Sequence, residues 1–243
     1  MNWKRIVVWG ALIIAFFFLV PPIVQNQSYH LFADSRTILR IPNCWNVLSN
    51  LPFVIVGLLG LWNLRGTANC VLFTGVLLTG LGSSYYHLAP SDSRLVWDRL
   101  PMTVVFMSVL ASALAGENNL RNQIRTLAMF VAFGIASVIW WSWTGDLRLY
   151  VLVQFGSLLL LVPSLRFVPN GRFLAAVVAF YAFAKAAEFG DHAMFGVLPV
   201  SGHTTKHLLS EIATYLIYRW QISVASSGDA RSKALPVPEP IHL

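Results

Sequence analysis

Five polar residues of this 243-residue chain have types and spacings that suit hydrolysis at a metal ion. Ser83 and His87 are four positions apart, Asp98 follows, and His203 and His207 are again four apart. Residues four apart share one face of a helix. Three neutral imidazoles with a water make an open zinc site, a nearby carboxylate can take a proton from the water, and a hydroxyl can donate to a developing oxyanion. The five residues supply candidates for all of these roles.

The elements that must position these residues are membrane helices. Hydrophobic residues make up 56% of the chain and charged residues 11%, and the mean hydropathy is +0.64. Soluble domains carry about 25% charged residues, so this chain lacks the polar surface to face water all round. The net charge of +7 is dispersed, with no run of more than two Lys or Arg residues. We interpret it as topology information and headgroup contact, and expect no nucleic-acid partner.

We expect an all-α polytopic bundle of about eight transmembrane helices, since each span needs roughly 17–25 apolar residues. The expected spans are about 6–24, 46–64, 68–88, 98–116, 125–144, 148–165, 172–190 and 203–220. The last two contain charged residues, among them Lys185, Glu188, Lys206 and Glu211. Charges at membrane depth are costly unless they are paired or face an interior cavity, so they indicate a functional site.

Loop charges predict which ends of the helices face the cytoplasm, because cytoplasmic loops are enriched in Lys and Arg. With the N-terminus inside, the inner segments hold Lys4, Arg5, Arg65, Arg121, Arg125, Arg166, Arg172, Arg219, Arg231 and Lys233. The outer segments hold the smaller group, Arg36, Arg40, Arg94, Arg99 and Arg148. Both termini are therefore expected in the cytoplasm, with the five candidate residues in the outer half of the bundle. The compact loops favour a bacterial inner membrane.

Each candidate also has a simpler structural explanation. A histidine in a membrane helix often forms a hydrogen bond between packed helices. Ser83 could bond back to the carbonyl four residues earlier, and Asp98 could cap the free amides at the start of its helix. Spacing alone leaves these alternatives open.

At these residues the chain resembles the alkaline ceramidase family, within a superfamily that also contains the adiponectin receptors. The family pattern is a serine and a histidine four apart, an aspartate eleven positions on, and a late H-x-x-x-H, matched by Ser83, His87, Asp98 and His203-x-x-x-His207. A second family block, W-N-T-x-S-N, resembles Trp45-Asn46-Val47-Leu48-Ser49-Asn50.

The resemblance implies a zinc-dependent amidase with His87, His203 and His207 as ligands. Asp98 would handle the water, Ser83 would assist at the oxyanion, and a sphingolipid-like amide would arrive laterally from the bilayer. The resemblance covers about 43–220. We therefore divide the chain into an N-terminal transmembrane anchor and interfacial loop (1–42), a seven-helix ceramidase-like core (43–222) and a flexible tail (223–243).

The chain departs from the family pattern in two places. One lies just before the block Trp45–Asn50, and the other lies within it. Ceramidases of this family carry an acidic calcium-binding cluster here, but Asn43 stands where they have a glutamate, and only Asp34 remains upstream. Calcium prefers six to eight oxygen ligands, so we do not expect a matching calcium site. Val47 replaces the family threonine, with no effect that the sequence explains.

Other polar residues fall near the same helix ends. His30, Asp34 and Arg36 belong to an outer segment that could gate lipid access or anchor at the headgroups. His192 is interpreted as a loop residue, with a further metal contact as the alternative.

Two glutamates lie within the last two expected spans. Glu211, one turn from His207, could orient that ligand or could pair with Lys206, Lys185 or another buried cation. Glu188 is expected to pair with Lys185.

The sequence therefore predicts a zinc-dependent membrane hydrolase that cleaves the amide bond of a ceramide-like lipid. One alternative is a hydrolase of another lipid ester or amide. The other is a receptor or transporter with a structural metal site, which would need a fourth protein ligand.

Overall fold

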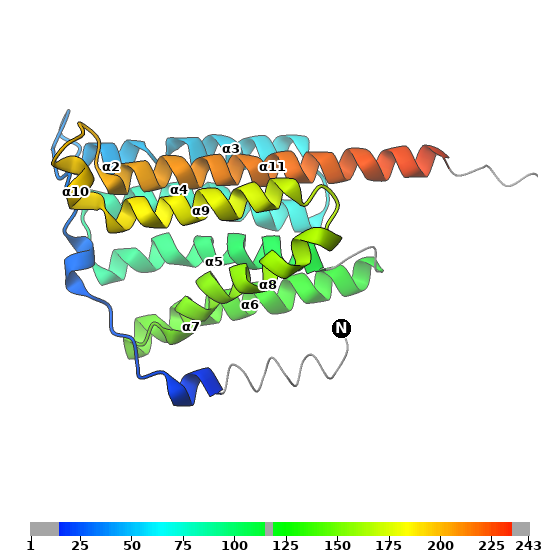
Figure 1. The fold of residues 1–243 in the computed structure, drawn as a ribbon, viewed down its shortest axis with the longest axis horizontal. Coiled ribbons are helices and arrows are strands. Elements are labelled where there is room, and N and C mark those ends of the chain that lie inside the picture. Colours follow the sequence, from blue (N-terminus) through cyan, green and yellow to red (C-terminus); the bar gives the residue numbers. More distant parts are fainter. Residues whose placement is uncertain (1–14, 115–118, 235–243) are drawn as a thin grey trace, which may run out of the picture.

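A computed structural model of the protein describes residues 15–114 and 119–234, and their regular structure is helical, as predicted (Figure 1). The elements are η1 (Gln27–His30), α2 (Cys44–Leu48), α3 (Leu51–Asn63), α4 (Thr67–Leu88), α5 (Asp92–Leu114), α6 (Leu120–Thr144), α7 (Arg148–Val151), η2 (Leu152–Gly156), α8 (Ser157–Ser164), η3 (Leu165–Phe167), α9 (Arg172–Phe189), α10 (Asp191–Phe195) and α11 (Gly202–Ala234). Together they form an all-α polytopic bundle.

Five helical segments of the described chain are long and apolar enough to cross a membrane. They are Cys44–Asn63, Thr67–Leu88, Asp92–Leu114, Leu120–Thr144 and Arg148–Phe167. The protein is therefore a multi-pass membrane protein. The expected seventh and eighth spans correspond to α9 and α11, which pack on each other and carry Lys185, Glu188, Lys206 and Glu211. Most of the expected first span lies outside the described residues, and its last part is helical at 15–19.

Two helix boundaries differ from the sequence-based prediction. The fourth span was expected to start at Asp98, but α5 begins at Asp92, where the Ser91 hydroxyl accepts a hydrogen bond from the Arg94 amide. Asp92 and Arg94 are charged, so the hydropathy pattern places them in a loop, but charged residues also occur at helix ends near the membrane surface. Asp98 is therefore not an N-cap. Arg99, which had been counted as an outer loop charge, is a buried residue of this helix.

The last helix is also longer than predicted. α11 continues to Ala234 rather than ending near 220, so it includes the first part of the segment expected as a flexible tail. Residues 235–243 of that segment lie outside the described part of the chain.

One end of the bundle, called the polar end below, carries the five candidate residues Ser83, His87, Asp98, His203 and His207. α4 reaches it with its last turns, and α5 and α11 begin there, next to α2 and α10 (Figure 1). The segment between residues 20 and 43 runs across this end (Figure 1). Bridging hydrogen bonds hold its start, because the Leu147 amide donates to the Ile23 carbonyl.

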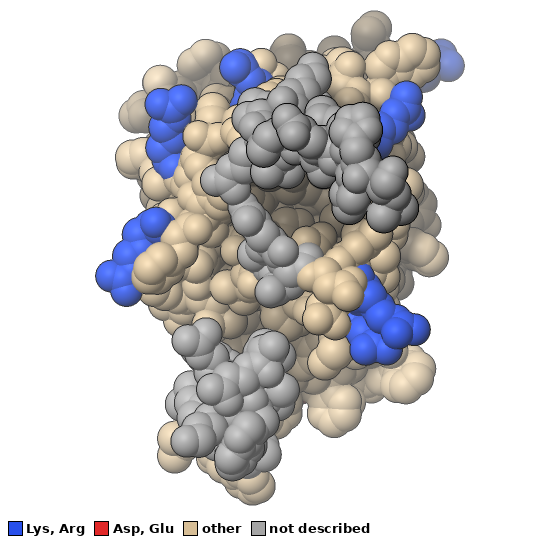
Figure 2. Space-filling view, turned by 90° about the vertical axis from the view of Figure 1, so that its right-hand side faces the viewer, with Lys and Arg blue, Asp and Glu red and all other residues tan. Residues whose placement is uncertain are grey.

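The opposite end of the bundle is basic. It contains the connections after α3 and α8, with the exposed residues Arg65, Arg166 and Arg172. Figure 2 looks at this end and shows Lys and Arg side chains around it, with no acidic side chain of the described residues in view.

A close approach of α4 and α5 sets the geometry at the polar end. Pro101 lies inside α5 and has no amide hydrogen to donate to the Trp97 carbonyl one turn earlier. Gly82 of α4 packs against that carbonyl, and a methyl group on Gly82 would overlap the Trp97 oxygen. Small residues let membrane helices approach in this way. The next residues on the two helices are Ser83 and Asp98.

Substitution of Gly82 by alanine should therefore destabilise the protein. The added methyl group meets backbone, which cannot rotate away, so we expect a loss of about 1–3 kcal/mol in unfolding free energy. Thermal or denaturant unfolding in detergent micelles measures the change. Gly196→Ala is the control, because a methyl group there meets only ordinary contacts at 3.5 Å. Equal stability of the two variants would contradict the tight approach.

Candidate metal centre

Three buried imidazoles converge at the polar end of the bundle. His87 comes from the last turn of α4, and His203 and His207 come from the first turns of α11. Each pair of rings has centroids 4.9 Å apart. The side chains are 4% exposed or less. The four-residue spacing places His203 and His207 on one face of α11, turned toward α4.

The arrangement of nitrogen atoms suits a metal ion. One ligand atom of each histidine lies within 4.8 Å of the others, and Nε2 of His87 is 3.4 Å from Nε2 of His203. Two nitrogen ligands at the usual bond length from a tetrahedral zinc are about 3.3 Å apart. The three histidines can therefore hold a metal ion.

No fourth protein ligand joins this group in the described part of the chain. Neither Asp98 nor Glu211 belongs to the set of ligand atoms that could share an ion. His192, the alternative ligand considered from the sequence, lies exposed on α10 and also outside the set.

Ser83 and Asp98 face each other beside the histidines. The Ser83 hydroxyl interacts with the Asp98 carboxyl group across the α4–α5 contact, and both side chains are buried. Ser83 lies one turn before His87 on the same helix. The structure thus brings all five candidate residues to one place.

The Trp-Asn block supplies the hydrogen bonds that orient the last helix. The Ser49 hydroxyl lies 2.7 Å from Nδ1 of His207. The Asn46 side chain accepts a hydrogen bond from Thr204 at 2.8 Å and donates one to the Asp34 carbonyl at 3.1 Å. A partner on the second ring nitrogen fixes the orientation and tautomer of a metal-binding histidine.

Asp191 fixes the start of α11. One carboxylate oxygen accepts the His203 amide at 2.7 Å, and the other accepts the Ala33 amide at 2.9 Å. Gly202 makes this contact feasible, because a methyl group there would overlap the Ala187 carbonyl. Asp191, the first residue of α10, therefore joins the backbone at Ala33 to the backbone of the candidate ligand His203.

The segment before α2 covers the histidines. The Phe32 ring packs on His87 and His203, with centroids 4.7 and 4.4 Å away. His30 contacts the Tyr86 hydroxyl at 2.8 Å and an Asp92 oxygen at 3.1 Å. The expected outer loop is thus held against α4 and α5.

A buried ion cluster adjoins the histidines. Glu188 pairs with Lys185 at 2.7 Å, as predicted, and with Lys206 at 2.8 Å. The Lys206 ammonium nitrogen is also 3.3 Å from Nε2 of His203. Both lysines considered as partners for Glu211 therefore pair with Glu188, and one oxygen of Glu211 is buried without a hydrogen-bond partner.

Phe32, Ser49 and Asp191 support the site but have no sequence spacing that indicates it. Phe32 acts through ring stacking, Ser49 meets His207 across 158 residues, and Asp191 joins the nearby His203 amide to the distant Ala33 amide. Only Ser49 had a signal, because it belongs to the block that resembles the family pattern.

The sequence comparisons agree with the resemblance seen at these residues. The family model described as Ceramidase matches residues 37–168, more than half of the chain, and the protein belongs to this family. The matched region includes Ser83, His87 and Asp98 and ends before α9. A search of curated proteins finds no match. Membership in the family supports a ceramide-hydrolysing membrane enzyme.

Asp34, the one acidic residue upstream of the block, pairs with a cation. Both of its carboxylate oxygens accept hydrogen bonds from the Arg36 guanidinium, at 2.8 and 2.6 Å. These hydrogen bonds hold the pKa of Asp34 below its usual value. A carboxylate whose pKa is lowered on folding stabilises the protein above its unfolded pKa of about 3.9.

Stability should therefore fall as pH drops through the folded pKa of Asp34. We expect Asp34→Asn to be less stable than the wild type at neutral pH, with the difference shrinking below about pH 4. Melting temperatures of the two proteins between pH 7 and pH 3 test this, since other titrating groups cancel in the comparison. A difference that does not change with pH would contradict the ion pair.

Proposed function

We propose that this protein is a zinc-dependent hydrolase that cleaves the amide bond of a ceramide-like membrane lipid. The observation that carries the proposal is the convergence of three histidines with Ser83 and Asp98 at one end of a membrane bundle. A structural metal site would need a fourth protein ligand and would give Ser83 and Asp98 no evident purpose.

In this proposal His87, His203 and His207 hold the zinc ion, which when bound would polarise the amide carbonyl and acidify a water. Asp98 accepts a proton from the attacking water as its oxygen bonds to the carbonyl carbon. The carbon–nitrogen bond breaks, and Asp98 returns the proton to the leaving amine nitrogen. Ser83 donates a hydrogen bond to the carbonyl oxygen as negative charge develops on it.

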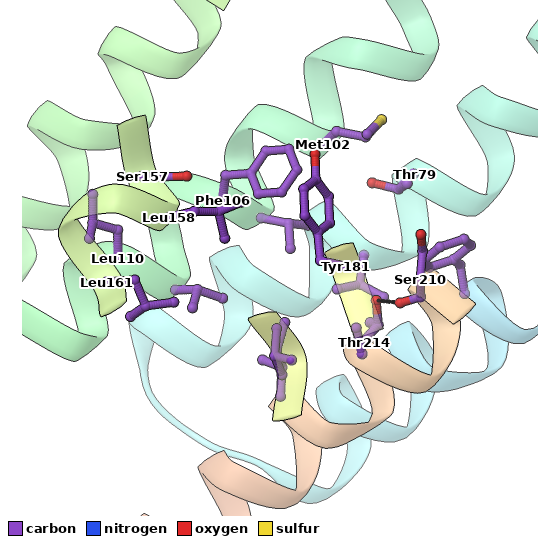
Figure 3. Close-up of a pocket in the computed structure, with 17 residues that line it drawn as sticks. Thr79, Met102, Phe106, Leu110, Ser157, Leu158, Leu161, Tyr181, Ser210 and Thr214 are labelled. Carbon is purple, nitrogen blue, oxygen red and sulfur yellow. Dashed lines mark hydrogen bonds between the residues drawn. The ribbon is translucent and has the colours of Figure 1, made fainter. Parts of the chain in front are cut away.

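An apolar cavity gives the acyl chain of a lipid a place to bind. It extends from Met102 to Leu110, about 12 Å along α5. Its walls come from α3, α4, α5, α8, α9 and α11 (Figure 3). Tyr181 and Ser210 lie on the lining, and most of the other side chains are hydrocarbon. A ligand that enters here is largely apolar.

The candidate site is proposed to face away from the cytoplasm. The end of the bundle opposite the histidines is the basic one in Figure 2, and cytoplasmic loops are enriched in Lys and Arg. This supports a C-terminus in the cytoplasm and, with the predicted first helix, an N-terminus there as well.

Metal content and lipid turnover test the proposal together. Purified protein is expected to hold about one zinc per chain, and His207→Ala to lose it, because two histidines are too few ligands. Asp98→Asn should keep the zinc but lower turnover of ceramide by about a hundredfold or more, as expected for a general base. His192→Ala is the matched control and should change neither quantity, since that ring is exposed.

A screen of ceramides against acyl esters separates the amidase from an esterase at the same centre. Absence of zinc, zinc retained by His207→Ala, or no metal-dependent turnover of any lipid would overturn the proposed function. In the last case a receptor or transporter would become the better explanation.

Ser49→Ala should weaken metal binding without removing a ligand. The hydroxyl fixes the His207 ring through Nδ1, and loss of such a partner typically costs about 10- to 100-fold in metal affinity. Competition with a zinc chelator measures the change. Ser142→Ala is the control, because that exposed hydroxyl bonds only to the Ile139 carbonyl of its own helix. An unchanged affinity for Ser49→Ala would show that the ring needs no such support.

A further inference from the structure

A second cavity, of about 190 Å³, lies beside the histidines. Asp98, Arg99, Lys185 and Lys206 contribute to its lining. It shares Met102, Tyr181 and Ser210 with the apolar cavity, so the two spaces adjoin. The polar cavity therefore reaches from Asp98 of the candidate site to the space proposed for the acyl chain.

The charges around this cavity do not balance. Lys185 and Lys206 both pair with Glu188, and Asp98 carries the second negative charge, so three cations face two carboxylates. Arg99 is the cation left over, because within the described residues its guanidinium forms no ion pair with a carboxylate. A buried charge without an ionic partner is costly, so its presence indicates a role.

The surroundings of Arg99 leave part of its hydrogen-bonding edge unused. The guanidinium stacks on Trp141 and Tyr150, with ring centroids 4.3 and 4.7 Å from Cζ. Nη2 donates to the Gln25 amide oxygen at 2.7 Å, whereas Nη1 is buried without a hydrogen-bond partner. The side chain is 6% exposed. The aromatic rings cover the two faces of the guanidinium. The N–H groups along its edge are the donors that can bind an anionic acceptor.

We propose that the polar cavity binds an acidic group, a carboxylate or a phosphate, on the amine side of the lipid amide, and that Arg99 determines this specificity. The inference rests on the proposed function, since it assigns the substrate class of the same site. With the acyl chain in the apolar cavity and the amide at the histidines, the polar part of the lipid lies beside Arg99. Arginine suits both acids because its donors match two oxygens at once.

Matched pairs of lipids test the assignment. N-dodecanoylglycine and N-dodecanoylethanolamine share the acyl chain and the amide, and differ in a carboxylate against a neutral hydroxymethyl group. Ceramide 1-phosphate and ceramide form the equivalent phosphate pair. Zinc-loaded wild type should favour the acidic member of at least one pair by about 10- to 100-fold in kcat/KM, the range for hydrogen bonds to charged groups. The pair that shows the preference identifies the acid.

The Arg99 variants separate recognition from a structural role. In Arg99→Gln the acidic-to-neutral ratio should fall close to one, and in Arg99→Lys it should be intermediate. Arg94→Gln is the control, because that arginine lies on the same helix, stacks on Tyr85 and does not line the cavity, so its ratio should match the wild type. A loss of turnover that is equal for both members of each pair would make Arg99 a structural residue and overturn the proposal.

Binding to metal-free wild type distinguishes this inference from the proposed function and needs no folded variant. Calorimetric titration with N-dodecanoylglycine and N-dodecanoylethanolamine, and with the ceramide pair, should show tighter binding of an acidic member even if no lipid is hydrolysed. Equal affinity for both members of both pairs would overturn the inference. Absence of metal-dependent turnover, with the binding preference intact, would instead count only against the hydrolase.

Discussion

Polar groups inside an apolar bundle have no water to bond with, and the architecture at one end of this protein follows from that constraint. Each buried charge or amide must find a partner in the chain or in a ligand. Glu188 meets the requirement by lying between two lysines, and Asp191 meets it with two backbone amides. The same requirement explains why the segment between residues 20 and 43 lies across the helix ends. Its side chains satisfy polar groups that the helices leave open, as Tyr29 does by donating to Glu188 at 3.0 Å.

Two kinds of interaction hold the candidate site together, helix packing and hydrogen bonds. The α4–α5 contact is rigid because two backbones touch at Gly82 and Trp97, so Ser83 and Asp98 have little freedom to separate. The histidines of α11 depend instead on hydrogen bonds from Ser49, which follows α2, and from Asp191 of α10. Catalytic geometry needs both the reacting groups and their supports to be fixed. Here packing fixes one half of the site, and hydrogen bonds fix the other.

The helices could be predicted from sequence because hydropathy depends on neighbouring residues alone. The start of α5 could not, since Asp92 and Arg94 look like loop residues until the fold gives them partners such as His30 and the Tyr85 carbonyl. For the site, helical spacing paired Ser83 with His87 and His203 with His207, and the expected topology placed Asp98 at the same end. The family pattern then implied a role for each of the five residues. The supporting contacts were beyond reach, because Asn46 meets Thr204 only after every intervening helix has packed. Family membership now agrees with the resemblance, while the roles of the individual residues are proposals.

The two hydrogen bonds of Asp191 have a mechanical consequence. Because one carboxylate reaches both the Ala33 and His203 amides, the covering segment and a candidate metal ligand share a single support. Lifting the segment to let a lipid in from above would release one of these bonds and loosen the other. A lipid route through the covering segment would therefore weaken the support of His203.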